Sequence, residues 1–406
     1  MKFLFEVTDF NSLDHFVPVA AEALRKDHFV TFLFKDCSVD ATDARVKYLN
    51  WFTRFETLQL NDLKVRLVDS VFTFLSRLFF GRRFSRCGFL DVRLKLLVRI
   101  SKLLFLYRGL RHIEFDCAIS GWGDPSSFAM TLALSRRKPI VALPHGYPCL
   151  KNSVFNKEVA RILEETGSLP DFSLRNNFDC YVVATERNRS QLVSWNVRPE
   201  KVEVWGNARF SPNWVETLLT FLPEFNDSRL VGHQQVVLFL LPAPTSNFKH
   251  AALRSLLINL ARLPIILVLK THTRMSSQID IIPAEIMTLQ NVVLASETST
   301  TRLIESSHTV VNFATGTAID ALHIGRRLIF AKYLSDNAYS WEDCPSIETA
   351  SSEEECLSLV VDTSWNLEPS LHRDYLDQEV FAEGRVQNPP LHYATRLIEI
   401  ATAGRS

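Results

Sequence analysis

The feature that most constrains the fold is a regular alternation between short apolar runs and amphipathic segments. Apolar runs rich in β-branched residues predict buried strands, and apolar residues three or four apart predict helices. The expected strands are Lys2–Val7, Phe29–Phe34, Phe115–Ser120, Pro139–Leu143, Asp179–Ala184, Lys201–Trp205, Val236–Leu241, Ile265–Lys270, Val292–Ala295, Thr309–Phe313 and Leu328–Phe330. The expected helices are Ser12–Leu24, Ser126–Leu134, Asn156–Glu165, Arg187–Trp195, Ala251–Leu263, Ser299–Ser306, Ala318–His323 and Tyr393–Ala401. This alternation predicts parallel sheets with helices on both faces.

The alternation is interrupted between Gly206 and Gln235, where prolines and an Asn-Asp pair replace any sustained strand pattern. A chain of 406 residues is also too long for one ordinary core. We therefore expect an α/β protein with two Rossmann-like domains that face each other across a cleft. Residues 1–210 would form the N-terminal domain, 211–385 the C-terminal domain, and 386–406 a final helix. Ligands of such sheets bind at the carboxyl ends of the strands.

Composition excludes several classes of protein. Lys plus Arg equal Asp plus Glu at 45 each, which disfavours a uniformly basic nucleic-acid binder. The 7 cysteines form no C-x-x-C pair and no zinc-ligand spacing, so we expect free thiols in a reducing cytosol. Cys37, Cys117 and Cys180 sit in or beside apolar runs and are interpreted as core residues. Met1–Val7 is too short for a signal sequence, and no segment resembles a membrane span.

Charge is unevenly distributed along the chain. Asp91 is the only acid between Arg77 and Arg111, whereas acidic residues dominate from Asp336 to Glu383. Within the basic part, Leu90–Leu110 interleaves Arg and Lys with leucines. Such a helix can lie on an anionic membrane surface, which would make the protein peripheral at the inner face of the membrane. The alternative is an ordinary domain helix whose basic side chains face water.

The stretch His308–Phe330 predicts an anion site. Its expected strand ends at the small residues Ala314-Thr315-Gly316-Thr317, and a helix follows. Free backbone N–H groups and the helix dipole at such a turn attract phosphate. Thr315 and Thr317 would add hydroxyl donors, and Asp320 could accept hydrogen bonds from a ribose. The alternative is a tight turn capped by threonine.

Three histidines follow expected strands. His145 lies in Leu143-Pro144-His145-Gly146-Tyr147-Pro148, His272 lies in Lys270-Thr271-His272-Thr273-Arg274, and His15 comes soon after the first strand, in a loop expected to carry Asp9, Asn11 and Asp14 as well. Each could instead be structural.

Five short motifs follow one another between about residue 115 and residue 332. They are PHGYP, NNFDCYVVATERNRSQLV, VEVWGNARFSPNW, LKTHTR and NFATGTAIDAL. Their order resembles that of GT-B glycosyltransferases, and within them the CDP-glycerol glycerophosphotransferase-like and bacterial Kdo-transferase-like enzymes of surface polysaccharide assembly. The resemblance implies two domains, with the final helix packing back toward the first.

The same resemblance implies roles for individual residues. His145 would contact the acceptor or act as the catalytic base, His272 and Arg274 would neutralise the donor phosphates, and Thr315-Gly316-Thr317 would cradle them. Two motifs depart from the family pattern. Thr273 stands where those enzymes usually have proline, and Asn312–Thr317 replaces their acidic-aromatic-Ser-Ser sequence.

These residue types suit group transfer from a nucleotide donor. Negative charge builds on the departing phosphate, and preorganised cations and N–H donors stabilise it. Lys270, His272 and Arg274 would supply that stabilisation without a metal, since the sequence has no Asp-x-Asp motif. A histidine such as His145 has a pKa suited to a general base.

Four further residues have two interpretations each. Asp124 and Glu158 are alternative carboxylates for the base or the nucleophile, although Glu158 could be a solvated helix charge. Asn207 and Arg209, near the domain boundary, could contact substrate or hold the linker.

Together these features predict a cytoplasmic GT-B transferase that moves a sugar or polyol phosphate from a nucleotide-activated donor to a glycan or lipid-linked acceptor. The resemblance favours a CMP- or CDP-linked donor. No further cofactor, metal or nucleic acid is expected. The alternatives are an enzyme like UDP-N-acetylglucosamine 2-epimerase and an inactive nucleotide-sugar-binding protein.

Overall fold

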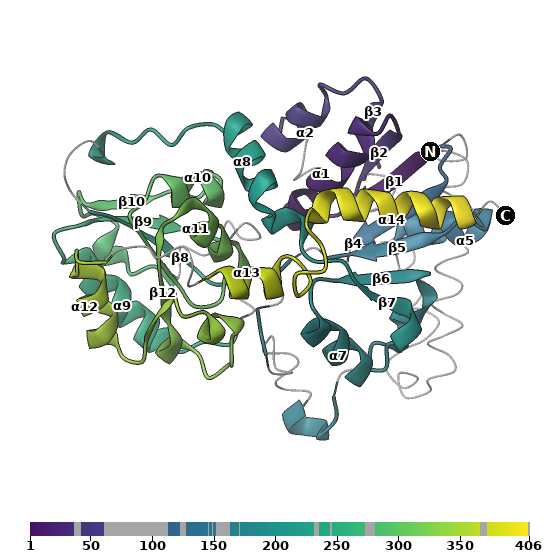
Figure 1. The fold of residues 1–406 in the computed structure, drawn as a ribbon. Coiled ribbons are helices and arrows are strands. Elements are labelled where there is room, and N and C mark those ends of the chain that lie inside the picture. The colour runs from purple at the N-terminus through teal and green to yellow at the C-terminus, as the bar shows by residue number, and fades with distance from the viewer. Residues whose placement is uncertain are drawn as a thin grey trace, which may run out of the picture.

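Two separate parallel sheets organise the computed structural model (Figure 1). The structure describes residues 1–35, 42–60, 113–121, 127–144, 146–147, 149–151, 163–169, 171–230, 235–243, 246–272, 281–365 and 372–404. In this part of the chain, no helix is both long enough and apolar enough to cross a membrane.

The N-terminal domain contains a seven-stranded sheet in the order β3-β2-β1-β4-β5-β6-β7. Its strands are β1 (Lys2–Val7), β2 (Phe29–Phe34), β3 (Phe55–Gln59), β4 (Cys117–Gly121), β5 (Ile140–Leu143), β6 (Cys180–Val183) and β7 (Val202–Val204). Every neighbouring pair is parallel.

The C-terminal domain contains a six-stranded parallel sheet in the order β10-β9-β8-β11-β12-β13. Its strands are β8 (Val236–Leu240), β9 (Ile266–Lys270), β10 (Val292–Leu294), β11 (Thr309–Asn312), β12 (Arg327–Ala331) and β13 (Glu348–Ala350). The predicted fold class, two parallel α/β sheets, is therefore confirmed.

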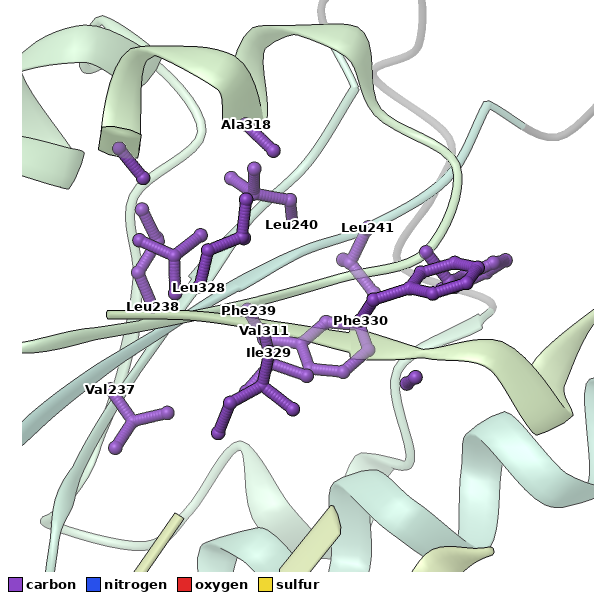
Figure 2. Packing of buried hydrophobic residues seen from close by; sticks show 14 of the residues in the cluster. Val237, Leu238, Phe239, Leu240, Leu241, Val311, Ala318, Leu328, Ile329 and Phe330 are labelled. Atoms are coloured by element: carbon purple, nitrogen blue, oxygen red, sulfur yellow. The ribbon is translucent and has the colours of Figure 1, made fainter. Parts of the chain in front are cut away.

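The apolar strands are buried on both faces, because successive side chains of a strand point to opposite sides of the sheet. In β1, Phe3 and Phe5 belong to one core of the N-terminal domain, while Leu4 belongs to the core on the other face. Figure 2 shows the same arrangement in the C-terminal domain, with Leu240 on the side of Ala318 and Val237 on the opposite side. A strand with two apolar faces needs helices on both.

The described helices cover these faces. They are α1 (Phe10–Arg25), α2 (Ala44–Leu49), α5 (Phe128–Arg136), α7 (Glu186–Ser194), α8 (Pro212–Phe221), α9 (His250–Ala261), α10 (Thr300–Glu305), α11 (Asp320–Ile324), α12 (Glu353–Val361), α13 (Arg373–Glu379) and α14 (Pro389–Ala403). Helix α1 begins earlier than predicted because Asp9 caps it, accepting a hydrogen bond from the Ser12 amide. Asn11, Asp14 and His15 therefore lie on the helix and not in the loop; for Asp14 and His15 this agrees with the predicted helix Ser12–Leu24.

Several elements were not predicted. Strand β3 is an edge strand with half-exposed side chains and no clean alternation. Helix α8 lies in the expected linker; it starts with Pro212, a residue favoured in the first helical turn, and buries Trp214, Val215 and Leu218. Helices α12 and α13 occupy the stretch after Tyr333, where the apolar pattern is weak. Cys117 and Cys180 are buried free thiols, as predicted.

The chain returns to the N-terminal domain at its end, where α14 packs along α1 (Figure 1). The Tyr393 hydroxyl donates to the Gly206 carbonyl at 2.7 Å, and the Tyr393 ring meets the Trp205 ring edge-on at 5.1 Å between centroids. Gly206 has a φ of +77°, and a Cβ there would lie 2.4 Å from the Val380 carbonyl oxygen. Only glycine fits this junction.

Candidate active site

The Gly316 turn, Asn312–Ile319, follows β11 as predicted, but its local structure differs from a regular helix start. Gly316–Ile319 forms a 3₁₀ turn, and the short helix α11 begins only at Asp320 and ends at Gly325, whose φ is +75°. The Asn312 side chain accepts a hydrogen bond from the Thr315 amide at 2.9 Å. The sequence suggested one helix, and the structure divides it because the first turn is wound more tightly.

The Gly316 turn carries unpaired hydrogen-bond donors. No described residue accepts a hydrogen bond from the Gly316 or Thr317 amide. The side-chain oxygens of Thr315 and Thr317 are buried and also lack a partner within the described ranges. Buried polar groups are nearly always paired in folded proteins, so each such group needs an explanation. The turn retains the donor capacity that the anion-site interpretation requires.

One feature of the turn was not predicted. A Cβ on Gly316 would lie 2.7 Å from the Cβ of Tyr147 and 3.2 Å from its carbonyl oxygen. Because Gly316 has no side chain, Tyr147, from the loop after β5, can pack directly against its backbone. This contact also shows that the carboxyl ends of β5 and β11, one in each domain, face each other.

Residues after β5 cross from one domain to the other. This crossing segment consists of Tyr147, Cys149, Leu150 and Lys151. The Lys151 amide donates to the Ala338 carbonyl and the Ser340 amide donates to the Cys149 carbonyl, both at 2.8 Å. Tyr147 and Cys149 belong to the core of the C-terminal domain. The segment thus follows a strand of the first sheet but packs in the second domain.

The Tyr147 hydroxyl joins a buried polar cluster, here the Tyr147 cluster. It donates to Glu379 at 2.5 Å and lies 3.2 Å from the hydroxyls of both Ser340 and Tyr375. Arg187, on α7 of the N-terminal domain, binds the same carboxylate through two N–H groups at 2.7 and 2.9 Å. Burial, with Tyr375 and the Glu379 charge nearby, raises the Tyr147 pKa well above its ordinary value. Tyr147 stays a neutral donor.

A second buried network, the domain clasp, joins Asp14 and Arg45 to Arg209, Thr301 and Asp320. Arg209 donates to Asp14 at 2.5 Å and to the two oxygens of Asp320 at 3.0 and 3.2 Å. The Arg209 side chain is 2% exposed and that of Asp320 is fully buried. Because Asp14 lies on α1 and Asp320 on α11, the clasp connects the two domains through the linker.

The electrostatics of the clasp follow from this geometry. Burial alone would raise the pKa of Asp14, but Arg209 and Arg45 outweigh it and hold the pKa at about 2. For Asp320, burial raises the pKa above its ordinary value, and Arg209 and Thr301 oppose that shift. Thr301 donates to Asp320 at 2.7 Å. Asp320, predicted to bind ribose, and Arg209, with two open interpretations, are here engaged with each other.

The end of β9 supplies a buried cation. Lys270 is 5% exposed, and its ammonium donates to the Ser296 carbonyl. Burial lowers its pKa to about 8, which the nearby Glu297 charge only partly offsets. An anion that binds near such a buried lysine stabilises its charged form, so the ammonium attracts a phosphate. His272, two residues further, is half-buried.

The remaining predicted residues are placed as follows. His145, Asp124, Glu158 and Arg274 lie outside the described residues, as does the basic run from Arg77 to Arg111. Asn207 is 1% exposed, and its backbone N–H donates to the Val380 carbonyl at 2.8 Å. The side-chain oxygen and nitrogen of Asn207 both lack a partner among the described residues. His15 is buried, with its ring edge-on to Phe210.

Sequence reasoning missed Glu6. This carboxylate, fully buried on β1, accepts hydrogen bonds from the Phe128 and Ala129 amides at the start of α5. Glu6 thus occupies the helix N-terminus of the N-terminal domain where an anionic ligand would otherwise bind. A single acid inside the apolar run KFLFEV was the available signal, because a buried charge must find partners.

The described residues contain no group of three or more His, Cys, Asp and Glu side chains arranged to hold a metal ion. No family model matches the sequence, and no curated protein does either.

Solved structures, however, match over nearly the whole chain. UDP-GlcNAc 2-epimerase from Neisseria meningitidis, bound to UDP-GlcNAc, is 13% identical, with 99% of this chain and 100% of that chain covered and a TM-score of 0.54. UDP-GlcNAc 2-epimerase from Methanocaldococcus jannaschii, in complex with UDP-GlcNAc and UDP, is 10% identical. The match covers 99% of this chain and 100% of that chain, with a TM-score of 0.57. The calicheamicin glycosyltransferase CalG4 is 12% identical, with 99% of this chain and 98% of that chain covered and a TM-score of 0.50. At these identities the likeness establishes the fold, and it confirms the predicted GT-B architecture.

Proposed function

We propose that this chain is an enzyme that binds a nucleotide-activated sugar or polyol phosphate through its C-terminal domain. The observation that carries the proposal is the contrast between the two domains. The Gly316 turn has amides and hydroxyls that no described residue pairs with, whereas Glu6 fills the comparable helix start of the N-terminal domain. A phosphate would find free donors in one domain and a carboxylate in the other.

The leading reaction is transfer to an acceptor. The bond between the transferred group and the nucleotide breaks, the acceptor hydroxyl forms the new bond, and the charge stays on the departing phosphate. Lys270, as an ammonium, and the amides of Gly316 and Thr317 are suited to stabilise that charge. His145 is the proposed base for the acceptor proton, with Asp124 and Glu158 as alternatives; His272 and Arg274 would add to donor binding.

The nucleotide is a finer proposal. The motif resemblance favours a CMP- or CDP-linked donor, whereas structural neighbours include proteins bound to UDP-GlcNAc. Polysaccharide assembly, with a glycan or lipid-linked acceptor, rests on the motif resemblance alone.

A UDP-GlcNAc 2-epimerase activity is the second candidate, because several structural neighbours with higher TM-scores than CalG4 are such enzymes. Epimerisation at C2 breaks and re-forms the C2–H bond and needs no acceptor. The two activities therefore differ in what they require.

The test combines binding with turnover. Calorimetry with CMP, CDP, UMP, UDP and GDP identifies the base, and proton NMR of UDP-GlcNAc with protein alone detects a C2 epimer. CMP- and CDP-linked donors are then offered with glycan acceptors. Epimer formation without an acceptor supports the epimerase, and product that needs both substrates supports the transferase. Binding without either reaction identifies a binding protein, and no binding at all refutes the proposal.

Membrane contact through the basic run Arg77–Arg111 is a separate proposal, which rests on the sequence. Sedimentation with liposomes tests it: binding should rise with phosphatidylglycerol content and fall with salt. Binding that ignores both would favour a solvated helix.

A further inference from the structure

We infer that Tyr147 is a positioning residue that fixes the loop after β5 against the Gly316 turn. The inference deepens the proposed function and rests on it for its catalytic consequence, although the contact itself does not. It starts from a contact between predicted motifs of the two domains, since a Cβ on Gly316 would lie 2.7 Å from the Tyr147 Cβ.

Tyr147 is held from both sides. Its backbone and ring abut Gly316, and its ring also packs 5.7 Å from the Phe210 ring and 5.6 Å from the Trp341 ring, measured between centroids. Its hydroxyl is fixed by Glu379, which is 1% exposed. A side chain held at its root and at its tip has essentially one orientation.

The hydroxyl contacts reach both domains. Tyr375 and Glu379 lie on α13, which lies between the two halves of the molecule in Figure 1, and Arg187 lies in the first turn of α7, a helix of the N-terminal domain. The two parallel N–H bonds from Arg187 orient the Glu379 carboxylate, and that carboxylate orients Tyr147. The position of the Gly316 turn therefore depends on residues of the first domain, through Tyr147.

The crossing segment extends this control. After Tyr147, the backbone pairs of Lys151 with Ala338 and of Cys149 with Ser340 bind the chain to the C-terminal domain. Leu150 and Tyr339 form an antiparallel bridge. The crossing segment is thus anchored to the domain that carries the Gly316 turn. A rearrangement of the domains would have to carry this segment with the second domain or break these bonds.

The expected consequence is an effect on turnover and not on affinity. Donor binding would use groups of the C-terminal domain, and Tyr147→Phe removes none of them; what it changes is how firmly the Gly316 turn is held relative to the first domain. Catalysis needs reacting groups of the two domains to be held at a fixed separation, and a misplacement of about 1 Å can lower the rate roughly 100-fold. Tyr147→Phe should therefore lower kcat by about 10- to 100-fold, with KM and nucleotide affinity within about twofold of the wild-type values.

The matched control is Tyr375→Phe. It removes one hydroxyl from the same cluster and also from a buried ring, but the atoms nearest to a Cβ on Gly316 all belong to Tyr147 and none to Tyr375. A merely structural role predicts that both variants lose stability and leave kcat alone. Gly316→Ala approaches the same contact from the other side and should reproduce the kcat loss of Tyr147→Phe.

Hydrogen exchange read by mass spectrometry provides a measurement that needs no substrate. In Tyr147→Phe, peptides containing the Thr315 amide, bonded to Asn312, and the Lys151 amide, bonded to Ala338, should both exchange about tenfold faster. In Tyr375→Phe, the peptide with Thr315 should keep its wild-type rate. Unchanged exchange at Thr315 in Tyr147→Phe, or equal acceleration in both variants, overturns the inference.

The two proposals fail separately. If the wild-type protein binds no nucleotide, the proposed function is wrong, while the exchange comparison still decides whether Tyr147 positions the turn. If nucleotide binds and Tyr147→Phe keeps its kcat, the positioning role is wrong and the proposed function stands.

Discussion

Replacing Arg209 with methionine tests whether the domain clasp holds the two domains together. Methionine keeps most of the side-chain length and removes the charge. Among the described residues, Asp320, fully buried, would then keep only Thr301 as a partner, and Asp14 would keep Arg45. Removing one partner of a buried ion pair usually costs about 3–5 kcal/mol, because the other charge stays buried and unpaired.

The second mutation of the cycle is Asp320→Leu. If the cost of Arg209→Met comes from the unpaired Asp320 charge, the double variant should regain most of the lost stability, since replacing a buried pair with apolar residues is often near neutral. Arg327→Met is the control: its side chain is 3% exposed, and its ion-pair partners among the described residues, Glu348 and Asp362, both lie in the C-terminal domain. It should lower stability without separating the domains.

Urea unfolding, followed by circular dichroism, gives the free energies, and small-angle X-ray scattering reports the separation of the domains. Arg209→Met should lower the unfolding free energy by about 3–5 kcal/mol and increase the radius of gyration, and Arg327→Met should leave that radius unchanged. Equal losses in Arg209→Met and in the double variant would refute the reasoning, because the penalty would not then come from Asp320.

The pH dependence of the clasp has a defined sign. The folded pKa of Asp14, about 2, lies below its ordinary value of 3.8, so the unfolded chain takes up the proton first as the pH falls. This stabilisation is complete above about pH 5. The stabilisation is lost as the pH falls toward 2, and the difference between the folded and unfolded pKa of Asp14 corresponds to roughly 2–3 kcal/mol of unfolding free energy. Asp320, whose pKa is raised, acts in the opposite sense. Arg209→Met should flatten the Asp14 part of the profile.

Two further predictions concern Gly206 and Lys270. Gly206→Ala should lower the free energy of unfolding by about 3 kcal/mol or more, because a Cβ would overlap the Val380 carbonyl. Gly384 has a similar φ of +76° but open space around it, so Gly384→Ala should lower that free energy by about 1–2 kcal/mol. Equal melting temperatures of the two variants would contradict this. Nucleotide affinity should fall as the pH rises through about 8, where Lys270 loses its charge, and Lys270→Met should bind weakly at every pH. A wild-type affinity constant from pH 7 to 9.5 in calorimetry would remove Lys270 from the site.

The sequence was sufficient for most strands of the two sheets and insufficient for the contacts between the domains. Buried strands such as β8 are continuous apolar runs, so their position is encoded locally. Strands and helices with few apolar residues, such as β13 and α13, are defined by what they pack against. Local patterns do not contain that information.

The candidate site shows the same division. The turn around Gly316 follows a strand, as predicted, because small residues after an apolar run are a local signal. That Tyr147 fills the space beside Gly316, or that Arg209 binds Asp320, depends on residues far apart in the chain. Glu6 lies between these cases, since its burial was predictable from the apolar run around it and its partners on α5 were not.

Phosphate should bind the Gly316 turn of the C-terminal domain, and hydrogen exchange with and without saturating nucleotide tests this binding most directly. The amides of Gly316 and Thr317 have no acceptor among the described residues, so a bound phosphate should slow exchange in the peptide that contains them. The peptide with Phe128 and Ala129, already bonded to Glu6, should not change. Protection at Phe128 and Ala129 with none at Gly316 would contradict the account.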